Sequence, residues 1–147
     1  MNSQLDLARQ QSGMILIEAL LAILIFSLGI LALVGLQAAA VKQSADAKYR
    51  TEAALLTNEI IGQMWVSDRT TAVLQANFNT GGTAYNNWLA RVSGILPGAA
   101  ANPPAIAIDG QGLATVTVNW IAPNEPATHP NGQPVQPHSY IAIAQIR

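Results

Sequence analysis

A long apolar run, Ala19–Leu36, constrains the fold of this chain more than any other feature. Its only polar side chain is Ser27. At about 1.5 Å of rise per residue the run extends roughly 27 Å as a helix, close to the ~30 Å hydrocarbon core of a bilayer. Further apolar residues extend it on both sides. The run therefore predicts a transmembrane helix.

Glu18 stands at the start of this run and is the only charged residue between Met14 and Val41. A charged side chain at the centre of a membrane helix costs on the order of 2.5 to 3.5 kcal/mol and is rare there unless it is paired or functional. Considered alone, Glu18 has a simpler explanation as a carboxylate that reaches the interface at the end of an ordinary helix. Its neighbours in the sequence decide between these interpretations.

The rest of the chain suits one modest domain. The 147 residues carry a formal net charge of −1, and from Lys42 onward acidic and basic residues balance. Because nucleic-acid binding needs a basic face, we expect no nucleic-acid partner. The chain has no cysteine, which excludes disulfides and zinc sites built on sulfur.

A cleaved secretory signal is the first alternative for the apolar segment. Such a signal has an apolar region of about 7 to 15 residues followed by small residues, as Ala38–Ala40 would be. The run is too long for this, and a carboxylate stands where a positive charge belongs. Loop charge does not fix the orientation, because Lys42, Lys48 and Arg50 after the run outnumber Arg9 before it.

The residues from Gly13 to Glu18 resemble the prepilin signature of type IV pilins and type II secretion pseudopilins. They combine a short polar leader, a glycine, an apolar Met14, a glutamate five positions into the mature chain and an uninterrupted apolar run. The segment Phe26–Gln37, with its glycine-spaced leucines and final glutamine, is similar to the PilV group of minor pilins.

The resemblance implies a processing route and three regions. Residues 1–13 would be a leader that prepilin peptidase removes between Gly13 and Met14, with N-methylation of Met14. Residues 14–41 would be the transmembrane and assembly half of a long helix. Residues 42–147 would be a periplasmic head that includes the amphipathic half of that helix.

The resemblance also implies partners and a location. Glu18 would contact the N-terminal amine of a neighbouring subunit as a filament grows. The partners would be other minor and major pilins, the prepilin peptidase, the inner-membrane assembly platform and membrane lipid. The protein would cross the bacterial inner membrane once, with its head in the periplasm, before incorporation into a pilus at the cell surface.

The glycines of this region carry separate expectations. Gly13 should disfavour continuation of the helix into the leader. Gly35 stands where many major pilins have proline, and Gly29 and Gly35 are candidate points of helix flexibility. Because glycine costs a helix about 1 kcal/mol and proline about 3, any kink should be mild. Six residues apart, the two glycines do not form the close-packing motif of membrane helices.

A helix is predicted to continue beyond the membrane segment, from about Met14 to Val66. Apolar residues recur there at spacings of three and four, typical of one apolar helix face; they are Val41, Ala45, Tyr49, Ala53, Leu56, Ile60 and Met64. The continuous helix should therefore have a second, amphipathic half that packs on the head.

The remainder predicts an α+β head, in which the long helix packs on a small antiparallel β-sheet as in pilins. The predicted elements are a helix over Asn87–Ser93, capped by Asn86 or Asn87, and strands over Ala105–Asp109, Ala114–Trp120 and Tyr140–Ile146, with a turn at Asp109–Gly112. In the third strand, Tyr140, Ala142, Ala144 and Ile146 should share one side. Trp65, Trp88 and Trp120 are expected in the core of the head.

Residues 123–137 hold five prolines and should form a surface loop. His129 lies within this segment and His138 directly follows it. The two histidines have no third ligand at a suggestive spacing, so we expect neither a metal site nor a cofactor. The chain also lacks a nucleophile elbow and a phosphate-binding glycine loop, which argues against an enzyme.

The function expected from these features is structural. The chain would be a minor type IV pilin that primes or caps pilus assembly together with other minor pilins. A minor pseudopilin of a type II secretion system is the first alternative. An uncleaved, single-span, membrane-anchored binding module is the second, and it predicts retention of residues 1–13.

Overall fold

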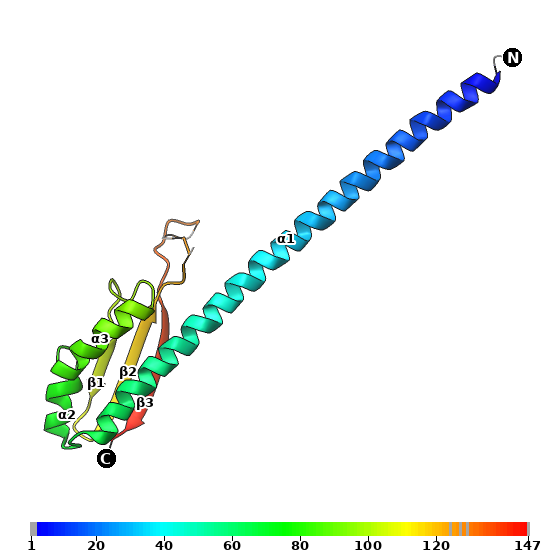
Figure 1. The fold of residues 1–147 in the computed structure, drawn as a ribbon. Coiled ribbons are helices and arrows are strands. Elements are labelled where there is room, and N and C mark those ends of the chain that lie inside the picture. The colour runs from blue at the N-terminus through cyan, green and yellow to red at the C-terminus, as the bar shows by residue number, and fades with distance from the viewer. Residues whose placement is uncertain (1–2, 124, 127, 129, 147) are drawn as a thin grey trace. The chain divides into compact units, whose positions relative to one another are not determined.

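The computed structural model describes residues 3–146 except 124, 127 and 129, with side chains from Gly13 onward. The chain divides into two compact units, Met1–Gln43 and Ser44–Arg147, which are considered separately. The elements are α1 (Ser3–Val66), α2 (Thr71–Phe78), α3 (Thr83–Ile95), β1 (Ala105–Ile108), β2 (Leu113–Trp120) and β3 (His138–Gln145) (Figure 1). The fold is α+β, as the sequence predicts.

The first unit is entirely helical in its described part. Helix α1 begins at Ser3 and passes through Gly13, so the expected start at Met14 is wrong for the intact chain. One glycine costs a helix only about 1 kcal/mol relative to alanine. The residues before Gly13 are rich in Leu, Ala, Arg and Gln, which favour helix, and this offsets the effect of Gly13.

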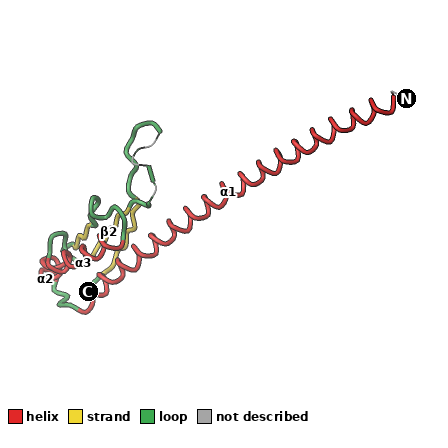
Figure 2. Tube along the Cα trace, turned by 45° about the horizontal axis from the view of Figure 1, so that its top comes forward, coloured by secondary structure: helices red, strands yellow, loops and turns green. Residues whose placement is uncertain are grey.

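The second unit contains a three-stranded antiparallel sheet in the order β1-β2-β3. Ile106 pairs with Val116, which in turn pairs with Ala142. Burial alternates along β1 and β2, so that every second side chain enters the core. One face of the sheet is therefore covered, and the helices of this unit lie beside the strands in both views (Figures 1 and 2).

The C-terminal part of α1 supplies the predicted apolar stripe to this core. Ala53, Ile60 and Met64 are fully buried and Leu56 nearly so. Ala45 and Tyr49 are half-buried. Val41 is an exception, because it belongs to the first unit and is 70% exposed. Apart from Val41, the periodic spacing correctly identified the face of α1 that packs on the head.

Two tryptophans occupy the core and the third does not. Trp88 and Trp120 are 2% and 4% exposed, and Trp88 Nε1 donates a hydrogen bond to Leu56 O at 2.9 Å. Trp65 is 44% exposed, so its expected core position is wrong. Trp65 directly follows the buried Met64 on a helix, and adjacent helical positions point in different directions.

Helix α3 begins earlier than predicted, and α2 was not predicted at all. The N-cap of α3 is Gly82 rather than an asparagine, although Asn86 donates a side-chain hydrogen bond to Gly81 O at 3.2 Å. Helix α2 is short, and its buried residues are Leu74 and Phe78. Two apolar anchors four residues apart are too weak a signal to indicate a helix from the sequence.

The turn between α1 and α2 is closed by Asp68. Its carboxylate accepts hydrogen bonds from Thr70 N at 2.9 Å and Thr70 Oγ1 at 2.6 Å. Both bonds favour the charged form and hold the pKa of Asp68 below its usual range. This arrangement is an Asx-type turn, in which a side chain satisfies backbone donors that neither helix uses.

The strands and their connections follow the sequence expectations. The turn at Asp109–Gly112 is present, with Asp109 Oδ1 accepting hydrogen bonds from Gln111 N and Leu113 N. Tyr140, Ala142 and Ala144 share the half-buried side of β3, and Ile146 beyond it is buried. The described part of residues 123–137 is irregular apart from an isolated bridge between Thr128 and Pro134.

Candidate functional site

The predicted processing and assembly residues lie on α1 within the first unit. Met14 and Glu18 are four residues apart on the helix, so Glu18 lies about 6 Å along the axis from Met14 and on the same face. Met14 is 75% exposed and Glu18 is exposed. A helix that began at Met14 would therefore place its terminal amine roughly one turn from this carboxylate.

The glycines of this unit have open surroundings. A Cβ added at Gly13, Gly29 or Gly35 would meet no heavy atom within 4 Å. Helix α1 continues without interruption through all three positions. No neighbouring atom within the described chain explains why glycine is needed there, so flexibility at Gly29 and Gly35 stays a prediction.

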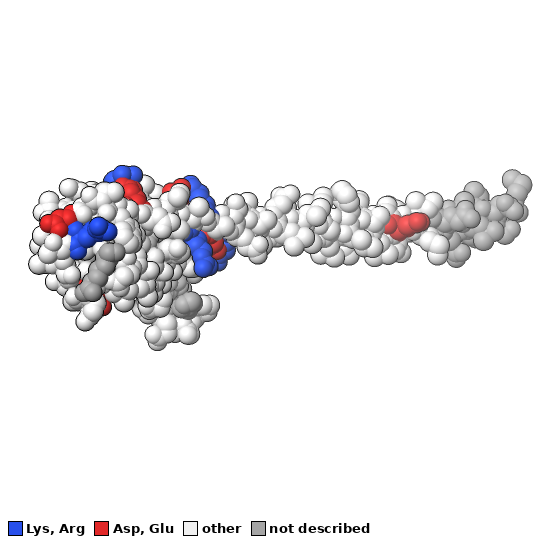
Figure 3. Space-filling model, turned by 90° about the horizontal axis from the view of Figure 1, so that it is seen from below, with Lys and Arg blue, Asp and Glu red and all other residues white. Residues whose placement is uncertain are grey.

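The apolar side chains of the first unit are exposed throughout. Every described residue from Gly13 to Gln43 is exposed, including Leu20, Ile25 and Phe26 at 65% or more. On the face seen in Figure 3, one red group interrupts the white surface of this unit. By length and composition, α1 is long and apolar enough to cross a membrane. In water, an apolar surface of this extent associates unless lipid or other helices cover it.

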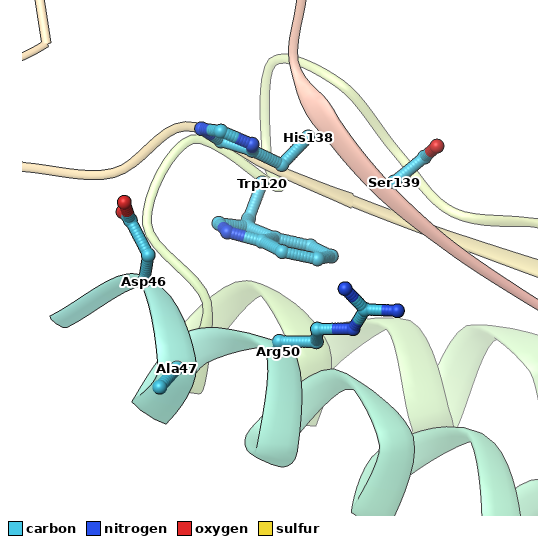
Figure 4. Close-up of a pocket in the computed structure, with 6 residues that line it drawn as sticks. All are labelled: Asp46, Ala47, Arg50, Trp120, His138 and Ser139. Carbon is cyan, nitrogen blue, oxygen red and sulfur yellow. The ribbon is translucent and has the colours of Figure 1, made fainter. Parts of the chain in front are cut away.

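A second candidate site is a surface pocket in the head, between α1 and the ends of β2 and β3. Its lining includes Asp46, Ala47 and Arg50 of α1, Trp120 of β2, and His138 and Ser139 of β3 (Figure 4). The register of the sheet explains part of this set, because Trp120 pairs directly with His138. Side chains of paired residues lie on the same face of a sheet.

Two of the pocket residues, Asp46 and His138, form a cluster with Glu125, and all three side chains can bind metal ions. One ligand atom from each of Asp46, Glu125 and His138 lies within 4.8 Å of the others. His138 Nε2 and Glu125 Oε1 are 2.9 Å apart, with the His138 side chain 40% exposed and that of Glu125 10% exposed. The cluster thus joins α1, the loop after β2 and the first residue of β3.

The indole of Trp120 forms one wall of this pocket. Its ring stacks on the imidazole of His138, with centroids 5.6 Å apart and an angle of 21° between the planes. Figure 4 shows the nitrogen-bearing edge of the indole on the side of Asp46, and the Arg50 guanidinium on the opposite side. The basic side chain is therefore directed away from the carboxylate of Asp46.

Sequence reasoning considered His138 but missed Asp46, Glu125 and Arg50. Asp46 is far from Glu125 and His138 in the sequence, and only the packing of α1 on the sheet brings it to them. No spacing rule connects residues on a helix, a loop and a strand. His129, the other histidine considered for metal binding, lies outside the described residues.

Comparison with known proteins gives no further indication. No protein family matches the chain, and no curated protein or solved structure is significantly similar to it.

Proposed function

We propose that this protein is a minor type IV pilin, anchored in the bacterial inner membrane by α1 and then incorporated into a pilus. The supporting observation is that Glu18 is the only charge on an otherwise apolar and fully exposed helical segment, one turn from Met14. The resemblance of Gly13–Glu18 to the prepilin signature gives that carboxylate a specific role. In this role the protein acts structurally, without catalysis or a cofactor.

An ion pair with the amine of a neighbouring subunit would account for the carboxylate of Glu18. Cleavage after Gly13 would create a positively charged amine at Met14. A carboxylate buried alone is costly, whereas one paired with a well-placed cation recovers much of that cost. In a filament, Glu18 of one subunit would meet the amine of a neighbour, so that both charges leave lipid surroundings together. The exposed apolar surface of α1 would pack against the same helix of other subunits.

Gly13 fits the processing step for a related reason. The intact chain is helical through Gly13, and a protease cleft takes an extended backbone. Among residues other than proline, glycine is the one at which a helix opens at the lowest cost, roughly 1 kcal/mol less than at alanine. Prepilin peptidase would therefore open the helix locally at Gly13 and cut before Met14.

The N-terminus of the protein extracted from membranes tests the proposal directly. We expect intact-mass and N-terminal peptide measurements to show loss of residues 1–13 and an N-methylated Met14. Gly13→Ala retains the helix and should block or strongly slow the cut, whereas Gly29→Ala should be processed normally. A mature protein that retains Met1–Gly13 would refute the pilin assignment and favour a membrane-anchored binding module.

Deletion of the gene identifies the filament. A minor pilin predicts fewer surface pili and reduced twitching motility, with protein secretion unchanged. Loss of type II secretion with normal pili would instead assign the chain to a pseudopilus.

A further inference from the structure

The cluster of Asp46, Glu125 and His138 beside the pocket contains two carboxylates in close proximity and little compensation for Asp46. Asp46 Oδ1 is shut off from solvent and has no hydrogen-bond partner among the described residues. A desolvated carboxylate oxygen without a donor is costly, and a second carboxylate nearby adds to that cost. The geometry therefore favours a cation between them.

We propose that Asp46, Glu125 and His138 form a binding site for one Zn²⁺ ion. Zinc is bound in proteins by histidine nitrogen and by Asp or Glu oxygen, as well as by cysteine. The imidazole argues against Ca²⁺ and Mg²⁺, which prefer oxygen ligands alone. Three protein ligands would leave a fourth position for water at the open side of the pocket.

The ligand atoms have separations close to those that zinc requires. At bond lengths of about 2.0 to 2.1 Å, two ligands of a tetrahedral ion lie roughly 3.3 Å apart. The His138–Glu125 pair is at 2.9 Å and all three ligand atoms are within 4.8 Å. Small side-chain rotations would bring Asp46 closer and separate the other pair slightly. The hydrogen bond between His138 and Glu125 would be exchanged for two bonds to the metal.

Trp120 provides an observation independent of the ligand cluster. It is 4% exposed, lines the pocket, and its Nε1 is buried without a hydrogen-bond partner among the described residues. Buried indole N–H groups normally have an acceptor. In a loaded site this N–H would donate to a ligand carboxylate or to zinc-bound water. Such outer contacts orient metal ligands, as does the stacking of Trp120 on His138.

The site would give the proline-rich loop an anchor at both ends. Glu125 lies near the start of residues 123–137 and His138 directly after their end, while Asp46 belongs to α1. An ion held by all three would fasten the loop to the helix of the head. This role does not depend on the pilin assignment.

The test uses the full chain in detergent after removal of metals with a chelator. Calorimetric titration should show one saturable Zn²⁺ site per chain, and Ca²⁺ or Mg²⁺ should not compete. Asp46→Asn and His138→Gln should each weaken Zn²⁺ binding by at least about 100-fold. Glu52→Gln, another carboxylate of α1 outside the cluster, should bind as the unsubstituted chain does.

Thermal unfolding separates a metal ligand from a merely structural side chain. Without metal, Asp46→Asn should unfold at the same temperature as the unsubstituted chain or higher, because it removes an uncompensated charge. With Zn²⁺, the unsubstituted chain should unfold at the higher temperature, since only this chain is stabilised by the ion. Absence of saturable Zn²⁺ binding to the unsubstituted chain, or equal stabilisation of Asp46→Asn and the unsubstituted chain, would overturn the proposal.

Discussion

Two polar groups in the core of the head, Thr57 Oγ1 and Trp120 Nε1, have no hydrogen-bond partner among the described residues, whereas other buried side-chain groups of this core are paired. Trp88 Nε1 donates to Leu56 O, and the Tyr85 hydroxyl donates to Pro104 O at 2.7 Å. Burial raises the pKa of that hydroxyl above its usual range, since it disfavours the phenolate. Thr57 is fully buried on α1, yet its Oγ1 has no hydrogen-bond partner among the described residues.

Replacing this threonine should therefore stabilise the protein. We expect Thr57→Val to raise the free energy of unfolding by about 1 kcal/mol, because a buried hydroxyl without a partner costs roughly 1 to 3 kcal/mol. Urea unfolding in detergent, followed by circular dichroism, measures the change. The control is Thr51→Val on the same helix, where the hydroxyl is exposed and bonded to Ala47 O; its effect should stay within about 0.5 kcal/mol. A clear loss of stability in Thr57→Val would show that the hydroxyl has a partner in solution.

A second prediction for a single residue concerns Glu18 and its role in assembly. Glu18→Ala should leave leader removal within a factor of two of normal but reduce incorporation into pili by at least about tenfold, the effect of ~1.4 kcal/mol. The reason is that a neighbour's amine would lose its counter-charge. Immunoblots of sheared pili and of membranes measure incorporation and processing separately.

Ser27→Ala is the matched control for Glu18→Ala. It removes the only polar side chain of the apolar run, whose hydroxyl donates to Ile23 O within the helix. Incorporation of this variant should be normal. If Glu18→Ala is also incorporated normally, Glu18 has no assembly role.

At the scale of elements, a helix end rather than a further strand protects one edge of the sheet. Thr80 N donates to Ile106 O at 3.1 Å, and Ile106 N donates to Thr80 Oγ1 at 3.0 Å. Asn79 Oδ1 accepts from Ile108 N at 2.8 Å. The residues after α2 thus satisfy the backbone of β1, which would otherwise be an open template for another strand.

The turn between α2 and α3 depends on a glycine. A Cβ at Gly82 would collide with backbone atoms of Asn77 and Ala76 in α2. We expect Gly82→Ala to lower the free energy of unfolding by about 1 to 3 kcal/mol, the usual cost of overpacking. Gly62→Ala is the matched control, because Gly62 is exposed within α1 with nothing near its Cβ position. That substitution should instead raise stability by roughly 0.5 to 1 kcal/mol. Denaturant midpoints of the two variants should move in opposite directions; a shift in the same direction would contradict this account.

At the scale of the whole molecule, the second unit contains all the buried hydrophobic residues of the described chain, from Ala53 to Ile146. From Gly13 to Gln43 every residue of the first unit is exposed, and most of them are apolar. The head can therefore fold without burying the apolar side chains of the N-terminal segment. The head has its own core, whereas residues 14–43 need a membrane or other helices.

A truncated chain tests this division. Residues 44–147 alone should be soluble without detergent and unfold in one cooperative transition, as small domains do. The full chain should require detergent or lipid, because its exposed apolar segment associates in water. Size-exclusion chromatography and thermal circular dichroism measure both properties. An aggregated or non-cooperative fragment would mean that the head depends on the first unit.

Patterns local in sequence determined much of this protein. The apolar run, the Gly13–Glu18 motif, the stripe on α1 and the alternation along β2 are each set by neighbouring residues and by helix or strand periodicity. They were sufficient to predict the long helix, the three strands and the α+β fold. Helix starts were less well predicted, because a weak breaker such as Gly13 or a short pair of anchors such as Leu74 and Phe78 leaves little local signal.

Only the tertiary structure decided which distant residues meet. The sheet pairs Trp120 with His138, and the packing of α1 adds Asp46 to His138 and Glu125. No spacing in the sequence reveals this cluster, because contacts between a helix, a loop and a strand depend on how the whole core packs. Position along the chain therefore determined the long apolar helix and its carboxylate, whereas the candidate zinc site depends on packing.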